Sequence, residues 1–163
     1  MIYERQSRYR SFGKRRSLRL QHFDYSQPYI VHLIWGTFQR RDLLRGFLAA
    51  DTVETVEDQA RKMGLLLVAY CVMPDHVHIL VSSEGQANPL TFVERVKGKT
   101  THQYWRRGGL GRLWQRGFYD HVLRSSEAAE DLARYILGNP VRKGLADSPG
   151  DYPFSGSAIT DLP

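Results

Sequence analysis

The chain has 163 residues, 42% of them hydrophobic, and carries a formal net charge of +6 at neutral pH. That length suits one domain with a substantial core, and the excess of Lys and Arg favours a polyanionic partner, nucleic acid first and an acidic membrane surface second. No apolar run approaches the ~20 residues of a membrane span, and one cysteine, Cys71, excludes a disulfide scaffold and a cysteine-based zinc site and is expected to be a small buried hydrophobe.

The first half of the chain predicts an arm, three strands and one helix. Residues 1–27 are basic and aromatic without sustained periodicity, which predicts an N-terminal arm; they lack the apolar stretch of a secretory signal, so we expect a cytoplasmic protein. Apolar residues at helical spacing predict a helix over residues 47–63, stopped by Gly64. The strands are expected in the runs rich in β-branched and aromatic residues, at 29–38, 65–72 and 76–82.

The second half predicts a basic helix over residues 90–107, a fourth strand over residues 114–124, and a last helix from Ser126 that ends at Asn139-Pro140. The first six elements follow the order of an α+β, ferredoxin-like split β-α-β sandwich with a four-stranded antiparallel sheet and its helices on one face. The last helix would then lie on the opposite face. We expect residues 28–163 to form a single domain.

Two histidines, His76 and His78, open the third predicted strand. Because side chains alternate along a strand, both imidazoles point to one face and can reach one metal ion, while Val77 and Ile79 turn into the core. The alternative interpretation is a pair of ordinary strand histidines with ordinary hydrogen bonds. Two imidazoles alone make a weak site, so a metal would need a further ligand from elsewhere in the fold.

Tyr135 and Asn139 are spaced by one turn on the last predicted helix. A phenol is a stronger acid than an aliphatic alcohol, so it is easier to activate as a nucleophile and easier to expel again. The amide oxygen of Asn139, with His76, His78 and water, suits Mg²⁺ or Mn²⁺ rather than a closed zinc site. The alternative is that Tyr135 is a core residue. Tyr104, a rival nucleophile on the basic helix, has no metal ligand one turn away, and we interpret it as a packing or DNA-stacking residue.

Basic residues are concentrated in residues 1–20 and 95–124, whereas the rest of the chain is net negative. Local basicity is typical of a nucleic-acid-binding surface, and the alternative is a solvated helix face plus a disordered tail. Aromatic residues at 114–119 suit stacking on unpaired bases, although Trp114 and Phe118 fit a strand core equally well. The DNA-binding residues that we predict are Arg15, Arg16, Lys97, Lys99, Arg106, Arg107 and Arg116.

Three ordered motifs carry a family resemblance. The segments 72–81 (VMPDHVHILV), 113–121 (LWQRGFYDH) and 135–144 (YILGNPVRKG) resemble the single-tyrosine HUH transposases, and the nearest branch is that of the REP-associated tyrosine transposases. The resemblance implies that His76 and His78 bind a divalent metal, that Tyr135 attacks DNA, and that Asn139 completes the metal site. Asp75 stands where the family commonly has Asn, a change that we expect to affect metal affinity.

The resemblance also implies an activity. Such enzymes cut single-stranded DNA beside hairpins, leave a 5′-phosphotyrosine and a free 3′-hydroxyl, and rejoin strands by the reverse step. Some members are dimers that exchange the tyrosine helix between subunits, and others act as monomers, so both remain open for this chain. Two other functions remain as alternatives: a non-catalytic DNA-hairpin-binding protein derived from a transposase, and a metal-dependent nuclease that uses water as its nucleophile.

Overall fold

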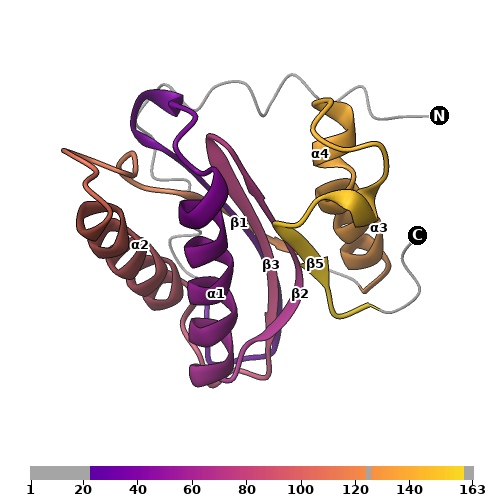
Figure 1. Cartoon of the computed structure of the whole chain (residues 1–163). Coiled ribbons are helices and arrows are strands. Elements are labelled where there is room, and N and C mark those ends of the chain that lie inside the picture. Colours follow the sequence, from indigo (N-terminus) through magenta and orange to yellow (C-terminus); the bar gives the residue numbers. More distant parts are fainter. Residues whose placement is uncertain (1–22, 124–125, 160–163) are drawn as a thin grey trace.

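A computed structural model describes residues 23–123 and 126–159, without the side chains of Ser126 and Glu127. Its centre is an antiparallel sheet in the order β4-β1-β3-β2-β5. Two long helices cover one face, and two further helices lie on the other (Figure 1). The strands are β1 (Tyr29–Gly36), β2 (Leu66–Met73), β3 (His76–Ser83), β4 (Tyr119–Leu123) and β5 (Ser155–Ser157).

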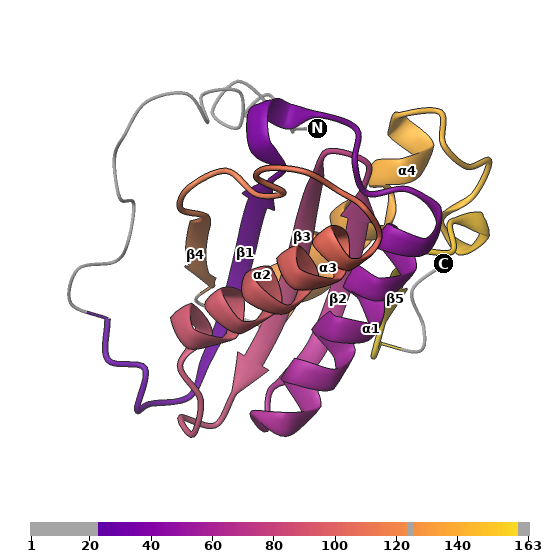
Figure 2. The ribbon, with the colours of Figure 1, turned by 60° about the vertical axis from the view of Figure 1, so that its left-hand side comes forward.

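The helices α1 (Gly46–Lys62) and α2 (Pro89–Arg106) complete the predicted β-α-β-β-α-β order and pack side by side on one face (Figure 2). Asn88 caps α2 by accepting a hydrogen bond from the Leu90 N–H at 2.8 Å, with Pro89 in the first turn. The split β-α-β arrangement predicted from the sequence is therefore confirmed. Within the described residues, no helix is long and apolar enough to cross a bilayer.

The sheet separates two hydrophobic cores because side chains alternate along each strand. On β3, Val77 and Ile79 face the first core, under α1 and α2, as predicted. Leu80 faces the second core, where α3 (Ser126–Leu137) packs through Ala133 and Ile136. The second core also contains the thiol of Cys71, which is buried and unbonded as predicted. The tyrosine-bearing helix therefore packs on a hydrophobic core of its own, on the far face of the sheet.

The fourth strand was predicted too long. Gly117 adopts a left-handed backbone (φ 74°), which interrupts the extended chain before Tyr119. Trp114 makes one bridge to Thr37, and its buried indole N–H donates to the Thr100 hydroxyl at 2.9 Å, so it belongs to the core. The short edge strand β5 was not predicted, and it adds a fifth strand to the expected four.

The end of the last helix also differs from the prediction. The helix α3 stops at Leu137, and Asn139-Pro140, which was expected to end it, opens a further short helix, α4 (Asn139–Arg142). Proline is tolerated in the first turn of a helix, where its missing N–H would have had no partner. Gly138 keeps a helical backbone between the two, so Tyr135 and Asn139 remain about one turn apart.

Candidate functional site

His76 and His78 lie at the start of β3, and their side chains converge on the far face of the sheet. Their Nε2 atoms are 3.0 Å apart, and the rings meet edge to face. Two nitrogen lone pairs cannot approach this closely unless a proton or a cation lies between them. The pair is therefore built either for a hydrogen bond or for a shared cation.

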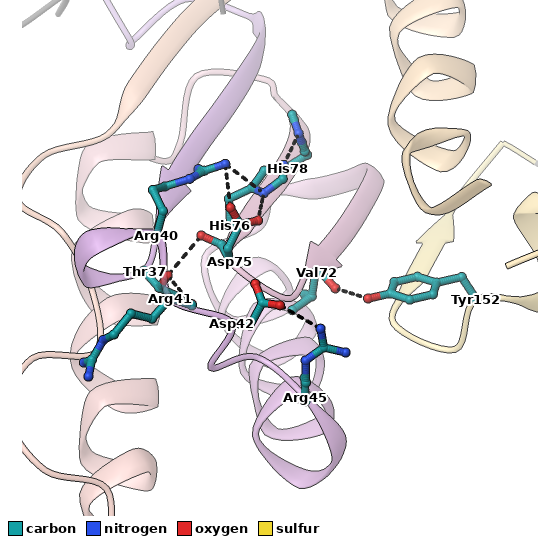
Figure 3. Close-up of polar contacts among 10 residues, drawn as sticks. All are labelled: Thr37, Arg40, Arg41, Asp42, Arg45, Val72, Asp75, His76, His78 and Tyr152. Carbon is teal, nitrogen blue, oxygen red and sulfur yellow. Dashed lines mark hydrogen bonds and ion pairs between the residues drawn. The ribbon is translucent and has the colours of Figure 1, made fainter. Parts of the chain in front are cut away.

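The Asp75 carboxylate fixes the orientation of His76 (Figure 3). Its Oδ1 lies 2.5 Å from His76 Nδ1, and its Oδ2 accepts from Arg40 Nη2 at 2.9 Å. Arg40 Nη2 also lies 3.3 Å from His76 Nδ1, but the shorter carboxylate contact assigns a proton to Nδ1. Burial alone would raise the pKa of the Asp75 carboxyl. The hydrogen bond and charge of His76, together with the charge of Arg40, have the larger combined effect, so the pKa lies below its usual value. The Nε2 lone pair of His76 is then available to a ligand.

Arg40 reaches Asp75 through an unusual turn. Gln39 and Arg40 both have positive φ, 57° and 56°, a conformation that costs on the order of 1–3 kcal/mol per non-glycine residue. Gly36 ends β1 opposite His76, and a Cβ there would lie 3.0 Å from the Arg40 guanidinium and 2.9 Å from Gln115 Nε2. The missing side chain of Gly36 therefore opens the path by which Arg40 crosses the strand end.

His32, in the middle of β1, contacts His78 from the other side. Its Nε2 is 3.1 Å from His78 Nδ1, and the two rings stack with centroids 5.3 Å apart. Burial, with a smaller effect of the His121 charge, lowers the pKa of His32 to about 3. Burial and the charges of His76 and His32 also hold the pKa of His78 well below its usual value. Both rings are therefore neutral, as metal-binding imidazoles must be.

Tyr135 lies on α3 against the same histidine. Its ring meets His78 edge to face, with centroids 6.4 Å apart, and the Arg142 guanidinium lies 4.3 Å from the Tyr135 ring centroid. Arg142 Nη2 also donates to the Tyr135 carbonyl at 2.5 Å. Gly138 leaves room for the Arg142 side chain to fold back toward Tyr135, because a Cβ at position 138 would lie 2.7 Å from the guanidinium. The fold of the chain thus brings Tyr135 beside His78.

Asn139 is buried one turn after Tyr135. Its Oδ1 accepts from Arg142 Nη2 at 2.9 Å, and its buried Nδ2 has no hydrogen-bond partner in the described residues. An amide oxygen has two lone pairs, and the hydrogen bond from Arg142 uses one of them. Asn139 therefore retains capacity to offer an oxygen to a ligand.

These residues fit a divalent cation. Two nitrogens bound at about 2.1 Å and at right angles around one ion lie about 3.0 Å apart, which equals the distance between His76 Nε2 and His78 Nε2. Within the described residues, no group of three His, Cys, Asp or Glu side chains is arranged to hold a metal ion. Asn139, about one turn after Tyr135, is an amide that could add an oxygen to the two imidazoles. Two imidazoles and an amide oxygen would suit Mg²⁺ or Mn²⁺.

The predicted DNA-binding residues do not form one surface with this site. Lys99 and Arg106 are exposed on α2, which lies across the sheet from α3 (Figure 1). Arg107 is paired with Asp51 at 2.5 Å. Lys97 Nζ donates to the Gln115 and Gly117 carbonyls at 2.8 and 2.9 Å, and burial lowers its pKa to about 8. Its ammonium therefore holds the loop after α2. Two predicted residues lie outside the described part of the chain, Arg15 and Arg16.

Arg116 is the predicted residue that lies at the histidine end of the sheet. It is exposed and follows Gln115, whose N–H donates to the Gly36 carbonyl. Sequence reasoning missed the cations around it. Arg40 and Arg41 follow the end of β1 by four and five residues, and β1 runs antiparallel to β3, so it ends beside His76. We call this set the basic rim; its residues are Arg40, Arg41, Arg45, Arg112, Arg116 and Lys143.

A cavity of about 250 Å³ opens beside His76 and Asp75 within this rim. Arg40, Arg45 and Lys143 contribute cations to its lining. Two carboxylates also line it, Asp75 paired with Arg40 and Asp42 paired with Arg45, and the rest of the lining is partly apolar. Tyr104, the rival nucleophile, lies elsewhere, on α2. Its hydroxyl donates to the Leu110 carbonyl in the following loop at 3.1 Å. Of the two tyrosines, only Tyr135 contacts the histidine pair among the contacts described here.

Comparisons with known proteins find transposases. A family model described as "Transposase IS200 like" matches residues 25–139. The REP-associated tyrosine transposase of Escherichia coli K12 is 32% identical over 88 residues, which are 53% of this chain and 51% of that protein. The ISDra2 transposase TnpA of Deinococcus radiodurans is 36% identical over 72 residues, 44% of this chain and 51% of that protein. The chain thus matches about half the length of these relatives.

Solved structures extend the likeness to the fold. A REP-associated tyrosine transposase bound to a REP hairpin superposes with a TM-score of 0.68 over 83% of this chain and 79% of that one, at 23% sequence identity. A crystal structure of a transposase-like protein from Deinococcus radiodurans gives a TM-score of 0.52 at 28% identity, covering 71% of this chain and 94% of that one.

Proposed function

The chain belongs to the family of IS200-like transposases, and from that premise we propose that it cleaves and rejoins single-stranded DNA at hairpins through a 5′-phosphotyrosine intermediate. The observation that carries the proposal is the contact between Tyr135 and His78 within one chain. A nucleophile must lie beside the groups that bind the reacting phosphate, because positioning supplies a large part of the rate enhancement. The edge-to-face contact supports a site built from one chain, in which α3 is not exchanged between subunits.

The proposed chemistry uses few groups. The Tyr135 oxygen, after loss of its proton to solvent, attacks phosphorus and forms a P–O bond, while the bond to the 3′-oxygen breaks and that oxygen gains a proton. The products are a 5′-phosphotyrosine and a free 3′-hydroxyl, and the reverse attack by a 3′-hydroxyl releases the tyrosine. A Mg²⁺ or Mn²⁺ ion held by His76, His78 and Asn139 would polarise the phosphate oxygens.

Arg142 and Asp75 would hold the reacting groups in place. The Arg142 guanidinium contacts the Tyr135 ring, the Tyr135 carbonyl and Asn139 Oδ1, so it joins the nucleophile to the amide in one geometry. Asp75 does the same for His76 from the turn before β3. The cost of fixing these side chains is met during folding rather than during the reaction.

We propose that the basic rim binds the DNA strand next to the cleaved phosphate. Three of its cations, Arg40, Arg45 and Lys143, line the cavity at His76, and the apolar part of the cavity lining suits a base. The solved relative is bound to a REP hairpin, and the same class of partner, single-stranded or hairpin DNA, is proposed here. Lys99 and Arg106, on the opposite face, would contact only a more distant part of a hairpin.

The test is a covalent adduct. The protein is incubated with a single-stranded hairpin oligonucleotide and Mn²⁺, and an SDS-resistant complex is sought on a denaturing gel. Tyr135→Phe should abolish the complex, while the matched control Tyr104→Phe should keep it. His76→Ala should abolish it too, yet retain most hairpin binding because phosphate contacts dominate affinity.

Three outcomes would contradict this proposal. An adduct from Tyr135→Phe would mean that another residue is the nucleophile. Hairpin binding without cleavage under Mg²⁺ or Mn²⁺ would favour a non-catalytic binding protein. A product with a free 5′-phosphate and no covalent intermediate would favour a nuclease that uses water.

A further inference from the structure

His32 is a buried ring that contacts the proposed metal ligands without belonging to them. It lies on β1 with 1% of its surface exposed, and its Nε2 is 3.1 Å from Nδ1 of His78. Its own Nδ1 is buried and has no hydrogen-bond partner in the described residues. A buried polar atom without a partner costs about 1–3 kcal/mol, so its presence in the middle of a central strand calls for a functional reason.

When all three rings are neutral and no cation is present, the distances assign the position of each proton. Asp75 holds the Nδ1 proton of His76, so His76 Nε2 carries a lone pair. The 3.0 Å contact between His76 Nε2 and His78 Nε2 then requires a proton on His78 Nε2. His78 Nδ1 must accept, so the 3.1 Å contact requires a proton on His32 Nε2. All three neutral rings donate in one direction, toward Asp75.

Binding of a cation reverses part of this arrangement. If His76 Nε2 and His78 Nε2 both become ligands, the proton of His78 must move to Nδ1, because a neutral imidazole carries one proton. That N–H then needs an acceptor, and His32 Nε2 is the atom in place. His32 must in turn carry its own proton on Nδ1. This move breaks no hydrogen bond at Nδ1, because that atom has no partner in the described residues.

We propose that His32 is a positioning residue that fixes the tautomer of His78, acting for His78 as Asp75 acts for His76. The inference rests on the proposed metal site. His32 can serve in both states because each requires only a neutral ring with one proton, and the unpaired Nδ1 gives that proton a second place to reside.

The test compares two replacements of His32. In His32→Gln, the side-chain oxygen can occupy the place of Nε2 and accept from His78 Nδ1–H; in His32→Leu, nothing accepts. His121→Leu is the matched control, because His121 faces His32 across the β1–β4 pairing but is exposed. Mn²⁺ affinity is measured by the loss of the free-ion electron paramagnetic resonance signal, and thermal unfolding is measured for every variant.

We expect His32→Leu to bind Mn²⁺ about 10–100-fold more weakly than the parent, the loss typical of a removed partner of a metal ligand. His32→Gln should restore most of the affinity, and His121→Leu should leave it unchanged. Nitrogen-15 spectra of the parent with Mg²⁺ should show the His78 proton on Nδ1, and without Mg²⁺ on Nε2.

The failures can be told apart. If the parent and His76→Ala bind Mn²⁺ equally, the proposed metal site itself is wrong. If His76→Ala loses Mn²⁺ but a folded His32→Leu binds like the parent, the role of His32 alone is overturned. A His78 proton that stays on Nε2 in the presence of Mg²⁺ would also overturn it, whether or not His32→Leu folds.

Discussion

Docking of α3 on the far face of the sheet decides whether Tyr135 stays beside the histidines, and Ile136→Ala tests it. Ile136 is fully buried in the second core, against Leu80 and its neighbours. Replacing a buried Ile by Ala costs about 2–5 kcal/mol, a large part of the roughly 5–15 kcal/mol that stabilises a domain. At about 2–4 °C per kcal/mol for a chain of this size, a 3 kcal/mol loss lowers Tm by about 6–12 °C.

The loss of stability should be greatest in the layer that contains α3. Because α3 packs only on the far face, Ile136→Ala should speed amide hydrogen exchange in residues 126–137 more than in α1. Ile79→Ala is the matched control, since Ile79 is equally buried but faces the first core; it should lower Tm by a similar amount without selective exchange in α3. Equal exchange profiles for the two variants would refute the idea that α3 is seated by its own core.

Two further predictions follow from single contacts. Asp75→Asn should lower Mn²⁺ affinity about fivefold in the same resonance titration, because a charge-assisted hydrogen bond to the imidazole becomes a neutral one, a difference of about 1 kcal/mol; unchanged affinity would show that the carboxylate charge is not used. The double variant Arg112→Ala, Arg116→Ala should weaken hairpin binding and reduce the salt dependence of the binding constant by that of about two phosphate contacts. The double variant Lys99→Ala, Arg106→Ala should weaken hairpin binding less, and a larger loss in this second variant would place the DNA on the α2 face.

The sequence predicted the sheet and the tyrosine helix because both depend on local signals. Alternation along the strand oriented His76 and His78 correctly on one face, and helical spacing placed Tyr135 on the helix that packs there. The strand β5 was missed because its residues, Ser-Gly-Ser, read as a turn, and pairing with β2 makes them a strand. Gly117 shortened the fourth strand by a backbone conformation that composition alone did not locate.

The contacts that surround the site could not be read from the sequence. His32 is one histidine in an apolar strand, and its contact with His78 depends on the pairing of β1 with β3 and on ring orientation. Arg40 reaches Asp75 through two left-handed residues, and neither is the glycine that would have indicated such a turn. The DNA-binding prediction counted charges along the chain and so could not separate the α2 face from the basic rim.

The central claim is that Tyr135 and the histidine pair of one chain form one active site. The most direct measurement mixes two inactive variants, Tyr135→Phe and His76→Ala, with hairpin DNA and Mn²⁺, and looks for the covalent adduct. Since each variant lacks one half of every site that a single chain can build, the account predicts no adduct above that of either variant alone. Recovery of the adduct on mixing would mean that the tyrosine of one subunit serves the histidines of another, and would contradict the claim.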